Sequence, residues 1–155
     1  MRTVYLEMSV AQQPPEAVYD ALADFAAYPE HANAVRSVTI EAAGEGWCES
    51  TWEADFRNGV MHWCERDTFL REEGRIEFEQ SEGDLERFSG SWVVADDGER
   101  TRIEFRAEFD LGLPTLADFL EPVAAQALAD NMRALVEGLL GDVELLSANA
   151  AVPSV

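Results

Sequence analysis

Residues 101–110 read Thr-Arg-Ile-Glu-Phe-Arg-Ala-Glu-Phe-Asp, and this stretch alternates strictly between apolar and charged side chains. A period of two is typical of a strand with one face in a core and the other in water. Gly112 and Pro114 end the alternation. Apolar residues then recur at helical spacing, so we expect one long helix from Thr115, as its N-cap, to about Leu146.

The chain before this stretch predicts a meander of hairpins. Strands are expected at 3–10, 37–42, 47–56, 61–69, 75–80, 86–95 and 101–110, separated by turns such as Asn58-Gly59 and Asp96-Asp97-Gly98. Pro14-Pro15-Glu16 opens a helix after the first strand, and Tyr28-Pro29-Glu30 starts a second short one. The prediction is an α+β fold with seven antiparallel strands, two short helices after strand one and a long C-terminal helix.

Length and charge limit the possible functions. The 155 residues suit one domain, expected over 1–146, with a flexible tail over 147–155. We expect no transmembrane segment and a cytoplasmic location, because no apolar run is long enough to span a bilayer and no signal peptide is evident. The net charge of −20 makes nucleic acid an improbable partner. All 11 basic residues are arginine, which excludes Schiff-base chemistry on a lysine.

The two cysteines are expected to remain free, buried thiols. If Arg57 pairs with Val60 across the Asn58-Gly59 turn, Cys64 lies opposite Glu53 and Cys48 lies near Phe69. The sulfur atoms are then several residues apart along the ladder, which is too far for a disulfide.

The inward strand faces predict a ligand cavity. One helix cannot fill the space over a strongly curved sheet, and the inward positions carry large rings where an ordinary core would use Leu, Ile and Val. The rings expected to line the cavity are Trp52, Phe56, Trp63, Phe88, Trp92, Phe105 and Phe109. Asn131 lies in the apolar stripe of the long helix, and its amide either bonds a neighbouring strand's backbone or faces a ligand.

Motifs of other functional classes are missing. The sequence has no Gly-rich dinucleotide fingerprint and no P-loop, and Ser89-Gly90-Ser91 is not a nucleophile elbow. The only histidines, His31 and His62, lie in different elements, so no metal site and no cofactor are expected.

Several segments resemble a known family. The element order, Asp24-Phe-Ala-Ala-Tyr28-Pro29-Glu30, the Trp92 strand, Phe109-Asp110 and Leu128-Ala-Asp-Asn131-Met132 are similar to the polyketide cyclase/dehydrase group of the START/Bet v1-like superfamily. The resemblance covers roughly residues 3–140 and implies the helix-grip fold. Trp63 and Trp92 resemble the pocket tryptophans of aromatase/cyclases, whereas Gly90-Ser-Trp92 and Arg102-Ile-Glu-Phe105 resemble the coenzyme Q-binding branch.

The resemblance implies two functions. The first is a cofactor-independent aromatase/cyclase that acts on a poly-β-ketone, with an acyl carrier protein as a candidate partner. The second is a carrier of a quinone or lipid that performs no chemistry. Asp67 and Glu79 stand where such cyclases have pocket arginines. The predicted catalytic residues are Asp67, Arg66 and Tyr28, and the predicted ligand-binding residues are Trp52, Trp63, Phe88, Trp92, Phe105 and Asn131.

Overall fold

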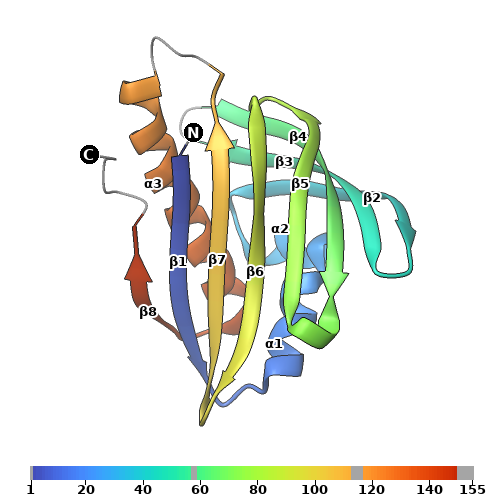
Figure 1. Ribbon diagram of the computed structural model, residues 1–155, viewed down its shortest axis with the longest axis vertical. Helices are drawn as coiled ribbons and strands as arrows, with labels where there is room; N and C mark the ends of the chain where they lie inside the picture. Colours follow the sequence, from blue (N-terminus) through green and yellow to red (C-terminus); the bar gives the residue numbers. More distant parts are fainter. Residues whose placement is uncertain (1, 57–58, 113–116, 150–155) are drawn as a thin grey trace.

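A computed structural model describes residues 2–56, 59–112 and 117–149 of the chain. Its main element is an antiparallel sheet in which eight described strands follow the order β2-β3-β4-β5-β6-β7-β1-β8. The bounds are β1 Arg2–Ala11, β2 Val35–Gly44, β3 Trp47–Phe56, β4 Gly59–Leu70, β5 Arg75–Gly83, β6 Arg87–Asp97, β7 Arg100–Asp110 and β8 Val143–Ala148. Figure 1 shows this sheet curving around the long helix α3, Ala117–Leu140.

Short helical segments follow β1 and close one end of the concave face of the sheet. Helix α1 spans Pro15–Ala23, a 3-10 turn covers Phe25–Ala27, and α2 covers Tyr28–His31. Pro15 suits the first turn of α1 because that position needs no backbone hydrogen-bond donor. The predicted α+β fold with two short helices and a long C-terminal helix is confirmed. It carries eight strands instead of seven.

The extra strand corrects the predicted end of the helix. Helix α3 stops at Leu140 because Gly141 adopts a left-handed conformation, with φ of 87°, that favours glycine. Val143–Ala148 instead forms a strand that pairs with β1. The sequence analysis extended the helix through this segment to Leu146 and began a tail at Ser147. The predicted N-cap, Thr115, and residues 150–155 lie outside the described residues.

The β3–β4 hairpin has a register two residues away from the predicted one. Thr51 faces Cys64 and Cys48 faces Asp67, and Phe56 pairs with Gly59. A shift of two residues keeps every side chain on its predicted face. Both cysteines are free: Cys48 is buried on the concave side, whereas Cys64 is only partly buried and lies on the outer face, where its sulfur is 3.4 Å from Thr51 Oγ1.

Helix α3 closely approaches α2 at Gly138. A Cβ atom at this position would overlap the backbone carbonyl oxygen of His31. Leu135 and Val136, one turn earlier, are almost completely buried. In contrast, Leu120, near the N-terminal end of α3, is exposed.

Replacement of Gly138 by alanine should therefore destabilise the fold. We expect Gly138→Ala to lower the free energy of unfolding by about 1–3 kcal/mol in urea denaturation, because a backbone atom has to move. Intrinsic helix propensity alone would raise stability by about 1 kcal/mol. Gly59→Ala, where an added Cβ meets nothing within 4 Å, is the matched control. An unchanged or higher stability for Gly138→Ala would contradict this contact between α2 and α3.

Candidate functional site

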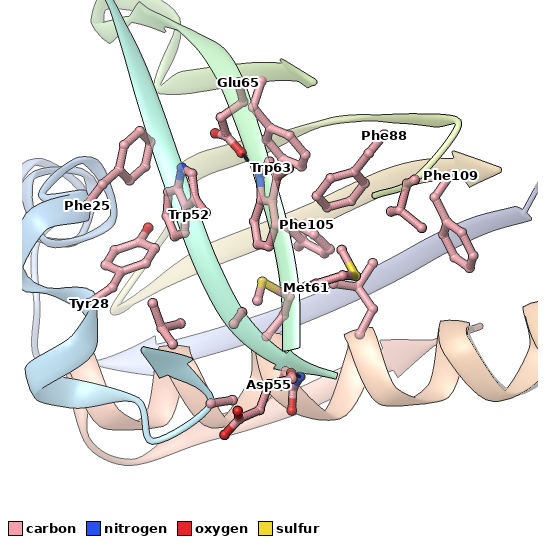
Figure 2. Close-up of a pocket in the computed structure, with 18 of the residues that line it drawn as sticks. Phe25, Tyr28, Trp52, Asp55, Met61, Trp63, Glu65, Phe88, Phe105 and Phe109 are labelled. Atoms are coloured by element: carbon pink, nitrogen blue, oxygen red, sulfur yellow. Dashed lines mark hydrogen bonds between the residues drawn. The ribbon is translucent and has the colours of Figure 1, made fainter. Parts of the chain in front are cut away.

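An apolar cavity lies between the concave face of the sheet and helix α3 (Figure 2). Its volume is about 80 Å³, well below the 300–1,000 Å³ that is usual for ligand pockets. Rings from several strands and from the short helices form most of its wall. The lining aromatic residues are Phe25, Tyr28, Trp52, Trp63, Phe78, Phe88, Trp92, Phe105 and Phe109.

The rings are held against one another in fixed geometry. Trp52 and Trp63, directly opposite each other on β3 and β4, stack with centroids 5.6 Å apart and planes 8° from parallel. Phe88 meets Trp63 edge to face at 5.8 Å, and Trp92 contacts Phe105 at 4.6 Å. Offset and edge-to-face ring pairs are the favoured arrangements, so these walls are already ordered without a ligand.

Flexible side chains close the cavity next to α3. Met61 of β4 and Met132 of α3 lie on its wall, together with Leu128. Methionine adapts its shape easily because it has three rotatable bonds and no branching. The volume available to a ligand can therefore grow at this end without movement of the backbone.

Asn131 joins the helix to the sheet at the rim of the cavity. Its Nδ2 donates to the backbone carbonyl oxygen of Asp55 at 3.2 Å, and its side chain also lines the cavity. Figure 2 shows Asp55 beside α3, on the opposite side of the cavity from Glu65. The Asn131 amide therefore combines the two alternatives of the sequence analysis. It bonds the backbone of a neighbouring strand and it faces the cavity.

Glu65 is the acidic residue that sequence reasoning missed. It is 5% exposed, lines the cavity wall, and its Oε1 accepts a hydrogen bond of 2.7 Å from Trp63 Nε1. Burial, and then the hydrogen bond with Asp67 and the charge of Asp67, raise the pKa of Glu65 well above its usual value. The signal was available, because β4 alternation puts Glu65 on the same face as Trp63 and Asp67.

Asp67 is fully buried one step further along β4, behind the cavity wall. Its Oδ2 accepts hydrogen bonds from Ser50 Oγ at 2.6 Å and from Cys48 Sγ at 3.3 Å. Burial, and then the charge of and hydrogen bond with Asp67, raise the pKa of Cys48 to about 12. Asp67 therefore contacts Glu65 and polar groups of β3, and it is not among the residues that line the cavity.

The other two predicted catalytic residues are placed differently. Arg66 lies on the outer face, where it pairs with Glu49 at 3.3 Å and stacks over Trp47 at 4.4 Å. Strand alternation turns it away from the cavity, and Glu79 is likewise exposed. Tyr28 does line the cavity, but its hydroxyl donates to the Leu22 carbonyl oxygen, and burial raises its pKa well above the usual value.

The predicted ligand-binding residues are all on the cavity wall. The structure brings together Trp52, Trp63, Phe88, Trp92, Phe105 and Asn131. Whether they bind a ligand stays a prediction. The side chain of Phe56 lies outside the described part of the chain.

No group of three or more His, Cys, Asp and Glu side chains among the described residues has the arrangement of a metal site. None of the described helices combines the length and apolar character that crossing a bilayer requires.

A curved antiparallel sheet that grips one long helix over an apolar cavity defines the class of helix-grip ligand-binding proteins. The family described as "Polyketide cyclase / dehydrase and lipid transport" matches residues 12–136, most of the chain. The chain belongs to this family. No curated protein matches the sequence.

Solved structures share the fold over almost the whole chain. The protein TTHA0849 from Thermus thermophilus is 27% identical with a TM-score of 0.82, and the match covers 89% of this chain and 94% of that one. The Zhui aromatase/cyclase from Streptomyces sp. R1128 is 22% identical, with a TM-score of 0.80 and coverage of 90% and 92%. A START superfamily protein from Mycobacterium smegmatis is 16% identical, with a TM-score of 0.77 and coverage of 88% and 96%.

The raised pKa of Glu65 predicts how stability depends on pH. Above the ordinary glutamate pKa of about 4.3, the unfolded chain loses this proton while the folded chain keeps it. The stability that Glu65 contributes is therefore present at low pH and is lost as pH rises toward the folded-state pKa. Relative to Glu65→Gln, which cannot titrate, the wild type should lose up to about 1.4 kcal/mol per pH unit as pH rises from about 5 toward the folded-state pKa of Glu65.

Urea denaturation of both proteins across this pH range measures the difference and cancels the general repulsion of a chain with net charge −20. Glu79→Gln, at an exposed position on the outer face, is the control and should follow the wild type. Parallel pH profiles for the wild type and Glu65→Gln would show that Glu65 is ionised in the folded protein at neutral pH.

Proposed function

We propose that this protein is a cofactor-independent aromatase/cyclase of the polyketide cyclase type. The observation that supports it is a buried carboxyl group, Glu65, on the wall of a cavity built mainly from aromatic and aliphatic side chains, where the other acidic lining residue, Asp55, is half exposed and paired with Arg36. Ring closure of a poly-β-ketone followed by loss of water needs a fixed chain conformation and one acid/base group. The stacked rings supply the first requirement and Glu65 the second.

Glu65 takes the catalytic role that the sequence analysis gave to Asp67. A buried carboxyl group with a raised pKa keeps its proton to higher pH and can give it to a carbonyl or departing hydroxyl oxygen. Its conjugate base can then remove the activated methylene proton. Asp67, which contacts Glu65 from behind the wall, acts through it as a positioning residue.

One observation favours a second function, a carrier of a hydrophobic small molecule such as a quinone or lipid. No arginine or histidine is among the described residues that line the cavity, and the chain has no lysine. An enolate formed there would lack a cationic partner. In this alternative the rings bind the ligand and no bond changes. A cytoplasmic location and an acyl carrier protein as partner belong to the enzymatic proposal.

Ligand binding in the cavity is common to both functions and is tested first. The planar, neutral probe 1-naphthol should quench tryptophan fluorescence, because Trp52, Trp63 and Trp92 all lie on the wall. Ala54→Phe adds a ring to the wall and should weaken binding at least tenfold, whereas Ala42→Phe, on exposed β2, should not. Equal quenching in all three proteins would place the probe outside the cavity and remove the basis of both functions.

Catalysis is tested with a poly-β-ketone generated in solution, whose spontaneous cyclisation products form a mixture. The wild type should convert the mixture largely to one dehydrated aromatic product. Glu65→Gln should form this product about 10²-fold more slowly while binding 1-naphthol normally, because only the acid/base group is lost. If the wild type leaves the product distribution unchanged, the enzymatic function is rejected and the carrier function remains.

A further inference from the structure

Glu65 and Asp67 form a carboxyl pair beside the cavity, and the hydrogen bonds around them all run toward their carboxyl oxygens. Trp52 Nε1 donates to Ser50 Oγ at 2.8 Å, so the Ser50 hydroxyl is free to donate its proton to Asp67 Oδ2 at 2.6 Å. The Cys48 thiol donates to the same oxygen. On the other carboxyl, Glu65 Oε1 accepts from Trp63 Nε1. An indole N–H can only donate, which fixes the direction of both chains.

One oxygen of the pair still requires a proton donor. Asp67 Oδ1 is buried, and no nitrogen, hydroxyl or thiol in the described part of the chain donates to it. Glu65 and Asp67 are both buried and lie two residues apart on the inward face of β4, close enough that Asp67 raises the pKa of Glu65. Two ionised carboxylates have no hydrogen to share, and they repel when buried together. The contact is attractive only if the pair holds one proton.

The network decides which carboxyl carries that proton. Asp67 accepts from a hydroxyl and a thiol, in addition to the contact with Glu65, and these donors stabilise its ionised form. Glu65 accepts from one indole and faces an apolar cavity. These donors therefore favour the proton on Glu65, and Asp67 Oδ1 is the oxygen that still lacks a donor.

Neighbouring elements offer no other group that changes charge near neutral pH. Cys48 on β3 and Tyr28 on α2 both have raised pKa values, because both are buried and lie near the carboxyl pair. Gln80 of β5, directly opposite Glu65 in the sheet, is neutral. With one shared proton, the pair as a whole carries a single negative charge.

We propose that Glu65 and Asp67 share one proton and that this pair makes the cavity selective for neutral ring compounds that carry a hydroxyl or enol group. This selectivity rests on the proposed function, because it assumes that the ligand binds in the same cavity. Before any proton transfer to a ligand, Glu65 shares its hydrogen with Asp67 and presents lone pairs to the cavity, where a hydroxyl or enol can donate. An ionised ligand would be desolvated next to the Asp67 charge, without a cation among the described lining residues.

Phenol, toluene and benzoate test this selectivity because each is a single ring that suits a small cavity. At pH 7, phenol should bind the wild type about five- to tenfold more tightly than toluene, which is the usual value of one hydrogen bond. Benzoate should not bind measurably. In Glu65→Leu, which has no acceptor, phenol should lose its advantage over toluene. Benzoate binding as tight as phenol binding in the wild type, or an unchanged phenol advantage in Glu65→Leu, would overturn the proposal.

Infrared spectroscopy tests the shared proton without any ligand. At pH 7 the exposed carboxyl groups are ionised, so the carbonyl band of a protonated carboxyl group should come from a buried one, and Glu65, Asp67 and Glu121 are the buried carboxyl residues in the described part of the chain. The band should shift when the glutamate side-chain carboxyls are labelled with ¹³C and stay in place when the aspartates are labelled. It should vanish in Glu65→Gln and persist in Glu79→Gln.

These outcomes separate the two proposals. A wild type without a protonated carboxyl band, or a band that shifts only with labelled aspartate, would overturn the assignment of the proton to Glu65. If neither 1-naphthol nor toluene binds in the cavity of the wild type, the proposed function is rejected. The infrared result does not depend on ligand binding and would stand in either case.

Discussion

The concave face of the sheet is wider than a single helix can cover, and the cavity follows from that mismatch. Eight described strands present a curved inner surface, and α3 crosses it as one cylinder about 10 Å wide. The short helices α1 and α2 close one end. Side chains have to fill what remains, and the sequence supplies flat rings from several strands. Rings that meet edge to face leave small spaces between them, which aliphatic side chains would interlock to remove.

The burial of two carboxyl groups at the cavity wall is a second constraint, with consequences for the neighbouring strand. Asp67 is fully buried, and Ser50 and Cys48 of β3 lie beside it as donors. The indoles of Trp52 and Trp63 then serve two purposes, because their rings form the wall and their N–H groups satisfy the polar network behind it. A change at one of these residues would therefore affect both ligand packing and the protonation of Glu65.

The apolar character of the cavity and its small volume bear on the substrate in different ways. The aromatic lining suits a planar ligand. A volume of about 80 Å³ is small even for one ring, so ring ligands such as 1-naphthol, and longer chains, require Met61 and Met132 to change rotamer. These residues are the natural positions for substitutions that would alter the length of the accepted ligand.

Sequence alone determined the fold class, the strand faces and the aromatic wall, because these depend on local periodicity. The alternation in 101–110 became β7, and the period-two pattern of β4 put Trp63, Glu65 and Asp67 on one face. The hairpin register was missed by two residues, since a slip of two leaves every side chain on the same face. Strand β8 was missed because Leu145-Leu146 continues a helical pattern, and only pairing with β1 makes it a strand.

Tertiary structure decided which acidic residue reaches the cavity. Periodicity gives Glu65 and Asp67 the same direction, and it cannot tell a carboxyl at the cavity wall from one buried behind it. That distinction depends on where β3 places Ser50 and Cys48 and on how the sheet curves around α3. The protonation of Glu65 has the same origin, because the pKa of a buried carboxyl is set by groups brought near it from other strands.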